Sequence, residues 1–177
     1  EAENLRYRKE QQYQHALDQQ HNYAGYYGGV RAVMNERHVL TGIEGTVADL
    51  IRVAEQFDLA ISTALGSSMQ SIVVQDDRAA RQAIQYLTQQ KAGRATFLPR
   101  TNIKPKYVSK SHLAQIENQP GYIGIASELI HIEPANRIIA EHLLGGTVIA
   151  NSLKEAQKLA QSTRHQVKIV TLDGDVL

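Results

Sequence analysis

Six basic side chains could contact nucleic acid, and their type and spacing point to chemistry more clearly than any other residues of the chain. They follow a long polar helical pattern and continue through a turn-rich segment: Lys91, Arg94, Arg100, Lys104, Lys106 and Lys110. Local clusters of Lys and Arg attract phosphate even when a chain is nearly neutral. The formal net charge is only +1, from 19 Lys and Arg and 18 Asp and Glu, so any such attraction must come from clustering. A solvated basic loop is the alternative.

The sequence lacks the residue patterns that enzymes use for catalysis. Its seven histidines are scattered, with no His-Glu-x-x-His pair that could hold zinc. Ser67 and Ser68 follow a glycine without forming a Gly-x-Ser-x-Gly elbow, and Asp173-Gly174-Asp175 predicts a turn. We therefore expect no catalytic residue, metal or cofactor in this chain. An uncharacterised α/β enzyme is the function with the least support.

Two segments repeat one order of helical and strand patterns, and these elements must position the basic residues. Each has a helix ending in Leu-Gly, an apolar strand, a capping residue, an amphipathic helix and a closing strand. The strands are expected at 71–74 and 94–98, then at 147–150 and 167–172. The expected caps are Asp76 or Asp77 and Asn151 or Ser152; the expected buried faces are Ala80, Ala83, Ile84 and Leu87, then Leu153, Ala156, Leu159 and Ala160. The repeat predicts a mixed α/β (α+β) fold of two related subdomains, with convergence onto a common α/β pattern as the rival explanation.

The same patterns predict the domain boundaries. Residues 1–24 are predicted to form a polar helix with a thin apolar stripe, expected to be a coiled-coil end or else a surface helix. Glycines at 25, 28 and 29 break it, so residues 25–28 are a predicted junction. Subdomain I is expected over 29–100, a basic connection over 101–120, and subdomain II over 121–177.

Composition narrows the class of protein. The chain has 177 residues, 42% of them hydrophobic, which is enough for one domain or two small subdomains. It has no cysteine, no apolar run long enough to span a membrane and no signal-peptide pattern. These features predict a cytoplasmic protein without a membrane partner.

A series of short motifs, in a fixed order, carries a family resemblance. It comprises Gly29–Val33, Gly45–Ile51, Ala60-Ile61 with Ala64–Gly66, Gln70–Val74, Ala80 with Ala83 and Ile84, Gly93–Pro99, Gly121 with Gly124 and Ala126, Leu143–Gly145, and Arg164 leading into Val170–Asp175. By itself Gly93–Pro99 predicts only a strand entered through glycine and closed by proline. Together the motifs resemble the hinge domain of bacterial SMC (structural maintenance of chromosomes) proteins over about residues 29–177.

The resemblance implies a module that joins two SMC chains and contacts DNA near its coiled coil, in chromosome condensation and partitioning. It places ATP and Mg at distant heads of the parent protein, it implies kleisin-type and accessory subunits that bind the parent outside this fragment, and it implies a nucleoid-associated protein. Members of the family usually continue beyond Gly174-Asp175 into a glycine-rich segment that helps to form the dimer seam. A stand-alone nucleic-acid-binding α/β module is the alternative function.

Dimerisation requires surfaces that can pair, and the sequence suggests two. If the strands near 121–126 and 145–150 have open edges, pairing across a two-fold axis would satisfy their backbone groups. The residues expected at such an interface are Gly121, Gly124, Gly145, Gly146 and Thr147.

Overall fold

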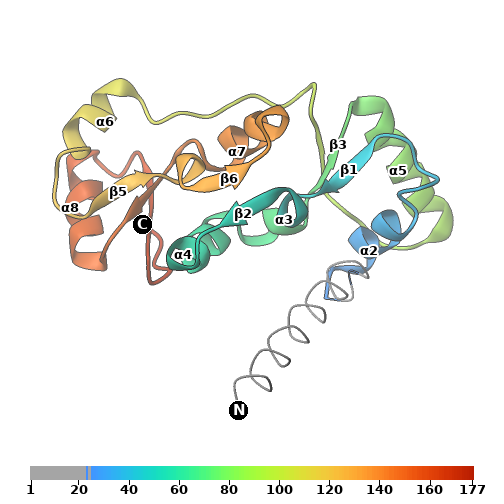
Figure 1. The fold of residues 1–177 in the computed structure, drawn as a ribbon, viewed down its shortest axis with the longest axis horizontal. Coiled ribbons are helices and arrows are strands. Elements are labelled where there is room, and N and C mark those ends of the chain that lie inside the picture. Colours follow the sequence, from blue (N-terminus) through green and yellow to red (C-terminus); the bar gives the residue numbers. More distant parts are fainter. Residues whose placement is uncertain (1–22, 24) are drawn as a thin grey trace, which may run out of the picture. The chain divides into compact units, whose positions relative to one another are not determined.

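The computed structural model describes residue 23 and residues 25–177, and these form two compact units (Figure 1). The first unit runs to Asp49 and resumes over Gln70–Pro99, and the second comprises Leu50–Met69 and Arg100–Leu177. The predicted coiled-coil end at 1–24 lies outside the described residues, apart from Tyr23.

In the described part of the chain, the first unit contains a three-stranded sheet and three helices, of which α3 is a short one at the unit boundary. Its elements are α2 (Gly28–Asn35), β1 (Ile43–Thr46), α3 (Val47–Leu50, which ends at the unit boundary), β3 (Ile72–Val74), α5 (Asp77–Gln90) and β4 (Phe97–Pro99). The strand order is β1-β3-β4, with β1 antiparallel and β4 parallel to β3. Apolar side chains of α2, β3 and α5 form the core, and Phe97 packs against them half-buried.

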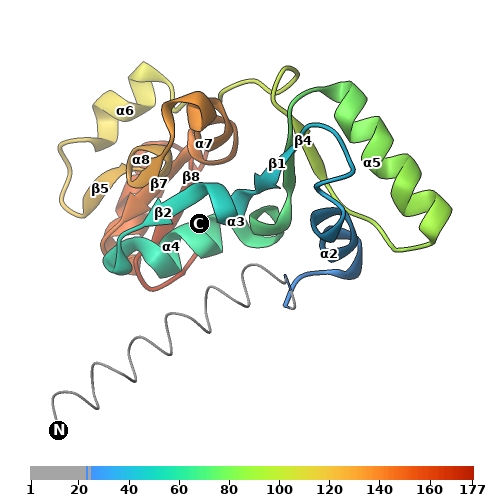
Figure 2. The ribbon, with the colours of Figure 1, turned by 45° about the vertical axis from the view of Figure 1, so that its right-hand side comes forward.

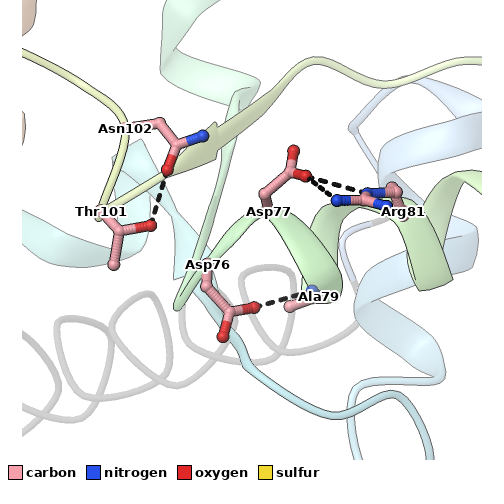
Figure 3. A network of polar contacts seen from close by, with 6 residues as sticks. All are labelled: Asp76, Asp77, Ala79, Arg81, Thr101 and Asn102. Atoms are coloured by element: carbon pink, nitrogen blue, oxygen red, sulfur yellow. Dashed lines mark hydrogen bonds and ion pairs between the residues drawn. The ribbon is translucent and has the colours of Figure 1, made fainter.

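Helix α5 begins where the sequence predicts. Asp76 is its N-cap, and the Asp76 carboxylate accepts a hydrogen bond of 2.9 Å from the Ala79 amide (Figure 3), a contact of a kind worth about 1 kcal/mol. The exposed Asp77–Arg81 pair in the same figure contributes less, because solvent screens it. Three of the four predicted buried positions are correct, but Ile84 is 49% exposed.

The second unit contains a matching sheet and a two-stranded ribbon. Its elements are β2 (Ile51–Val53), α4 (Glu55–Leu65), α6 (Lys110–Ile116), β5 (Tyr122–Ile125), η2 (Ala126–Glu128), β6 (Ile130–Ile132), η3 (Pro134–Asn136), α7 (Arg137–Leu144), β7 (Thr147–Ala150), α8 (Leu153–Ser162) and β8 (Lys168–Thr171); the short helix η1 (Gly66–Gln70) ends at the boundary between the units. Helix α8 packs on the sheet β5-β7-β8, and α6 packs on α8 (Figure 2). Strands β2 and β6 pair as a separate ribbon.

The repeat predicted from the sequence is confirmed in the topology. In each sheet the first strand is antiparallel to the middle one and the last is parallel to it. Each first strand also has a register shift, between Ile43 and Gly45 in β1 and between Tyr122 and Gly124 in β5. Ser152 caps α8 as expected, whereas Leu153, expected to be buried, is 42% exposed because it lies in the first turn.

The structure divides the chain differently from the predicted boundaries. Residues 50–69 belong with the second unit, although the sequence analysis placed them in a subdomain of 29–100. Strand β2 pairs with β6, and such pairing between distant segments leaves no local signal in the sequence. The predicted connection at 101–120 is not wholly a loop, since it contains α6 with Ser109 as its N-cap. The closing strand expected at 94–98 is shorter and begins at Phe97.

Candidate dimer and nucleic-acid interfaces

The sheet of the second unit has one outer strand edge at which no other strand pairs in the described part of the chain. Strand β7 is the middle strand, so the premise of an open edge near residues 145–150 is wrong. The outer side of β8 is covered by the chain itself, because Ile169 and Leu177 exchange two backbone hydrogen bonds of 3.1 and 2.8 Å. The remaining edge is that of β5.

Two of the five predicted interface residues lie in strands of this sheet, Gly124 in β5 and Thr147 in β7, and the other three directly precede those strands. The packing of the unit already requires some of them. Gly121 has φ +87° and packs against the Glu155 side chain, a backbone conformation that favours glycine. Gly124 and Thr147 are buried, and Gly124 contacts Leu129. Gly145 is also buried, and only Gly146 has open surroundings. Whether these residues meet a second chain stays a prediction.

The basic connection is fixed to α7 before it enters α6. The Lys106 amide donates a hydrogen bond of 3.1 Å to the Glu141 carbonyl, and the Lys106 carbonyl lies directly over the Cα of Gly145. The Lys104 carbonyl lies 2.8 Å from Nδ1 of His142. The backbone of this segment is therefore held in place, and the side chains of Lys104 and Lys106 extend from a fixed support.

The six predicted nucleic-acid contacts divide between the units. Lys91 and Arg94 lie in the first unit, where both are exposed. Lys104, Lys106 and Lys110 are exposed in the second unit, within seven positions of one another in the chain. Arg100 is half-buried there and donates a hydrogen bond to the side-chain oxygen of Asn136, so its guanidinium already serves the fold.

A small pocket in the second unit was not expected from the sequence. Its volume is about 240 Å³, and it is lined by Lys106, Tyr107, Val108, Leu113, Ile125, Ser127, Glu128, Arg137, Glu141 and Gly145. Tyr107 is 74% exposed, so its ring lies largely in solvent. The signal that could have revealed this site is the repeat itself, because residues 42–51 and 121–130 align without a gap and share both glycines of a Gly-x-x-Gly motif.

Two further features bear on the class of protein. Among residue 23 and residues 25–177, no group of three or more His, Cys, Asp or Glu side chains is placed to hold a metal ion. No helix in the described part of the chain combines the length and apolar character needed to cross a bilayer.

Comparison with known proteins identifies the family. The model of the SMC proteins flexible hinge domain matches residues 40–160. The chain is 42% identical over 153 residues to the chromosome partition protein Smc of Halothermothrix orenii and 40% identical over 158 residues to that of Bacillus subtilis. These alignments cover 86% and 89% of this chain but 13% of either relative, so the chain spans about an eighth of their length.

Solved structures agree with the sequence comparison. An asymmetric dimer of the Geobacillus stearothermophilus SMC hinge domain matches with a TM-score of 0.95 and 43% identity, over 99% of this chain and 70% of that one. The hinge domain of the Pyrococcus furiosus SMC protein matches with a TM-score of 0.67 and 36% identity, over 82% and 74%. The two three-stranded sheets have the same topology, and the hinge family model matches most of the chain. Together with the similarity to the solved hinge domains, these findings show that the chain belongs to the SMC hinge domain family.

Proposed function

We propose that this chain is the dimerisation module of a chromosome partition protein. The observation that carries the proposal is its likeness, at a TM-score of 0.95, to a hinge domain solved as a dimer. The hinge is a non-catalytic module in this reading. ATP hydrolysis, Mg binding and contacts with kleisin-type subunits would belong to other parts of the parent, which would act at the nucleoid.

The outer edge of β5 is the surface we propose for pairing with a second chain. Exposed strand edges invite further pairing, and proteins often protect them with a charged side chain. In the repeat, Ile123 of β5 corresponds to the exposed Glu44 of β1. The edge of the first unit thus carries a charge where the edge of the second carries an apolar side chain, which favours β5 as the interface.

Replacing Ile123 with Glu should therefore weaken the dimer at least tenfold while leaving the fold intact, because it places on β5 the charge that β1 already tolerates. Sedimentation over a range of concentrations measures the dissociation constant. Leu153→Glu is the control: it exchanges another apolar side chain of the second unit, an exposed one, for a carboxylate, in a helix first turn where negative charge is favourable. Equal dissociation constants for the two variants would rule out the β5 edge. A wild-type chain that stays monomeric at high concentration, also when extended beyond residue 177, would rule out the dimer.

We further propose that the chain contacts DNA through its basic residues. Lys104, Lys106 and Lys110 support this most directly, because they are exposed on a segment whose backbone is fixed to α7 and α6. A lysine whose backbone is already held in place loses less conformational entropy when it meets a phosphate than one on a mobile segment does. The exposed ring of Tyr107 could stack on an unpaired base.

Changing Lys104, Lys106 and Lys110 together to alanine should weaken DNA binding. The slope of the logarithm of the binding constant against the logarithm of the salt concentration should become about 2 to 3 less steep, because each phosphate contact on duplex DNA contributes about 0.9. Fluorescence anisotropy at several salt concentrations measures both. Lys154, Lys158 and Lys168, also exposed in the second unit, provide the matched control when they are changed to alanine. If both triple variants lost the same affinity, binding would reflect total charge and not this segment.

A further inference from the structure

The two copies of the repeat carry an acidic side chain at the same position. In the first copy this side chain accepts a hydrogen bond from a tyrosine of the chain, which indicates what the corresponding side chain of the second copy can bind. Residues 42–51 align with 121–130, so Asp49 corresponds to Glu128 and Thr46 to Ile125. Both acidic residues follow the first strand of their sheet, Asp49 within α3 and Glu128 within η2. A comparison of the two surroundings therefore tests whether the second copy has a related binding site.

In the first unit this acidic residue binds a tyrosine side chain. The hydroxyl of Tyr23 donates a hydrogen bond of 2.7 Å to Oδ2 of Asp49, and the same oxygen accepts one of 3.1 Å from the Thr46 amide. The Tyr23 side chain is buried, with the Tyr26 ring 5.1 Å away and the Arg37 guanidinium 5.6 Å from its ring centre. Burial, followed by the hydrogen bond to Asp49, raises the pKa of Tyr23, so the phenol stays protonated and remains a donor.

In the second unit the corresponding acidic residue lines the pocket of about 240 Å³. Glu128 is exposed there, and Ile125 lies beside it. The pocket is bordered by Lys106–Val108, the segment that leads into α6, just as Tyr23 belongs to the segment that leads into α2. The N-cap of α2 is Tyr27 and that of α6 is Ser109, so aligning the two caps places Pro105 at the position of Tyr23. Proline has no hydroxyl that could donate a hydrogen bond to Glu128.

The size and charge of the pocket indicate what it can bind. A cavity of about 150 Å³ takes up benzene, whereas sites for drug-sized ligands begin at about 300 Å³, so this volume suits one aromatic side chain. Val108, Leu113 and Ile125 provide an apolar wall. The charged groups balance, with Lys106 and Arg137 against Glu128 and Glu141, which favours a neutral ligand over an anion or a cation. Arg137 could face the ring as Arg37 faces Tyr23.

We propose that this pocket binds a tyrosine side chain presented by a partner polypeptide, with the phenol hydroxyl donated to the Glu128 carboxylate and the ring packed against Val108, Leu113 and Ile125. The site lies within the second unit and does not depend on the proposed dimer. A polypeptide is the expected source because the first unit takes its tyrosine from a chain segment, whose backbone adds contacts that a free phenol lacks.

The test is a titration of the isotope-labelled chain with N-acetyl-tyrosinamide, followed by NMR through the backbone amides of Ser127, Glu128 and Gly145. A ligand of this size should bind with a dissociation constant in the millimolar range. N-acetyl-phenylalaninamide should bind roughly tenfold more weakly, because a hydrogen bond to a charged acceptor is worth about that factor. Because Glu128 is exposed, the Glu128→Gln variant should fold normally, and it should lose the preference for tyrosine.

Three results would overturn the proposal. If the NMR signals of these amides did not shift at tens of millimolar ligand, the pocket would not bind tyrosine. Equal affinities of the tyrosine and phenylalanine amides, unchanged in Glu128→Gln, would remove the role of the carboxylate. Binding of p-cresol as tight as that of the tyrosine amide would overturn the assignment to a polypeptide, since the backbone would then contribute nothing.

Discussion

Alanine at Gly145 is expected to destabilise the second unit by about 3 kcal/mol, near the upper end of what overpacking usually costs. A Cβ at this position would fall well inside van der Waals contact with the carbonyl oxygens of Lys106 and Glu141. Both are backbone atoms, and the hydrogen bonds from the Lys106 and Gly145 amides to the Glu141 carbonyl hold them in place. The clash cannot be relieved by a side-chain rotation, so the connection must move off α7. Urea unfolding of the chain measures the loss.

The neighbouring glycine gives the matched control. A Cβ at Gly146 would meet only the Lys106 Cβ, at an ordinary 3.8 Å, so Gly146→Ala should change the free energy of unfolding by less than about 0.5 kcal/mol. Both glycines are predicted dimer residues, and the pair separates fold from interface. A Gly146→Ala chain that folds normally but dissociates would support a seam at this position. Equal destabilisation by both substitutions would contradict the packing described for Gly145.

The periodic parts of the fold could be predicted from the sequence. Strand β7 and the caps Asp76 and Ser152 were expected, because alternation and capping are local properties of the chain. Helix α6 was missed although Ser109 caps it and Leu113 and Ile116 have helical spacing. The lysines and nearby prolines of this segment led to the prediction of a loop, whereas packing against α8 stabilises a helix.

What the sequence did not provide depends on contacts between distant segments. The pairing of β2 with β6 moves residues 50–69 into the second unit, and the position of β7 between two strands closes the edge that residues 145–150 were expected to offer. The pocket likewise joins three separate segments. Among the predicted basic residues, only Arg100 is hydrogen-bonded to a buried side chain, that of Asn136. The position of Arg100 directly after a strand gives no sign of this contact.

Gly29→Ala is expected to destabilise the first unit, also by about 3 kcal/mol. Helix α2 approaches the backbone of the segment before β4 so closely that a Cβ on Gly29 would lie 2.6 Å from the carbonyl carbon of Arg94 and 2.7 Å from its nitrogen. Gly93, at φ +105°, makes the approach possible from the other side, because its own Cβ would lie 3.3 Å from the Gly29 nitrogen. Helix α2 therefore packs directly against the backbone of Gly93 and Arg94, the first two residues of the 93–99 motif.

Gly28→Ala is the matched control for this contact. Its Cβ would lie 3.7 Å from the Ala92 carbonyl oxygen, an ordinary contact, and alanine favours a helix over glycine by up to about 1 kcal/mol, so this variant should be as stable as the wild type or more so. Because two units can unfold separately, hydrogen exchange at the amides of α2, α5 and β3 is a better measure than one global transition. Gly29→Ala should speed exchange there and leave β7 and α8 protected. Loss of protection in both units together would mean that the chain unfolds as one cooperative body, whereas unchanged exchange in the first unit would show that α2 can move away from Arg94 at little cost.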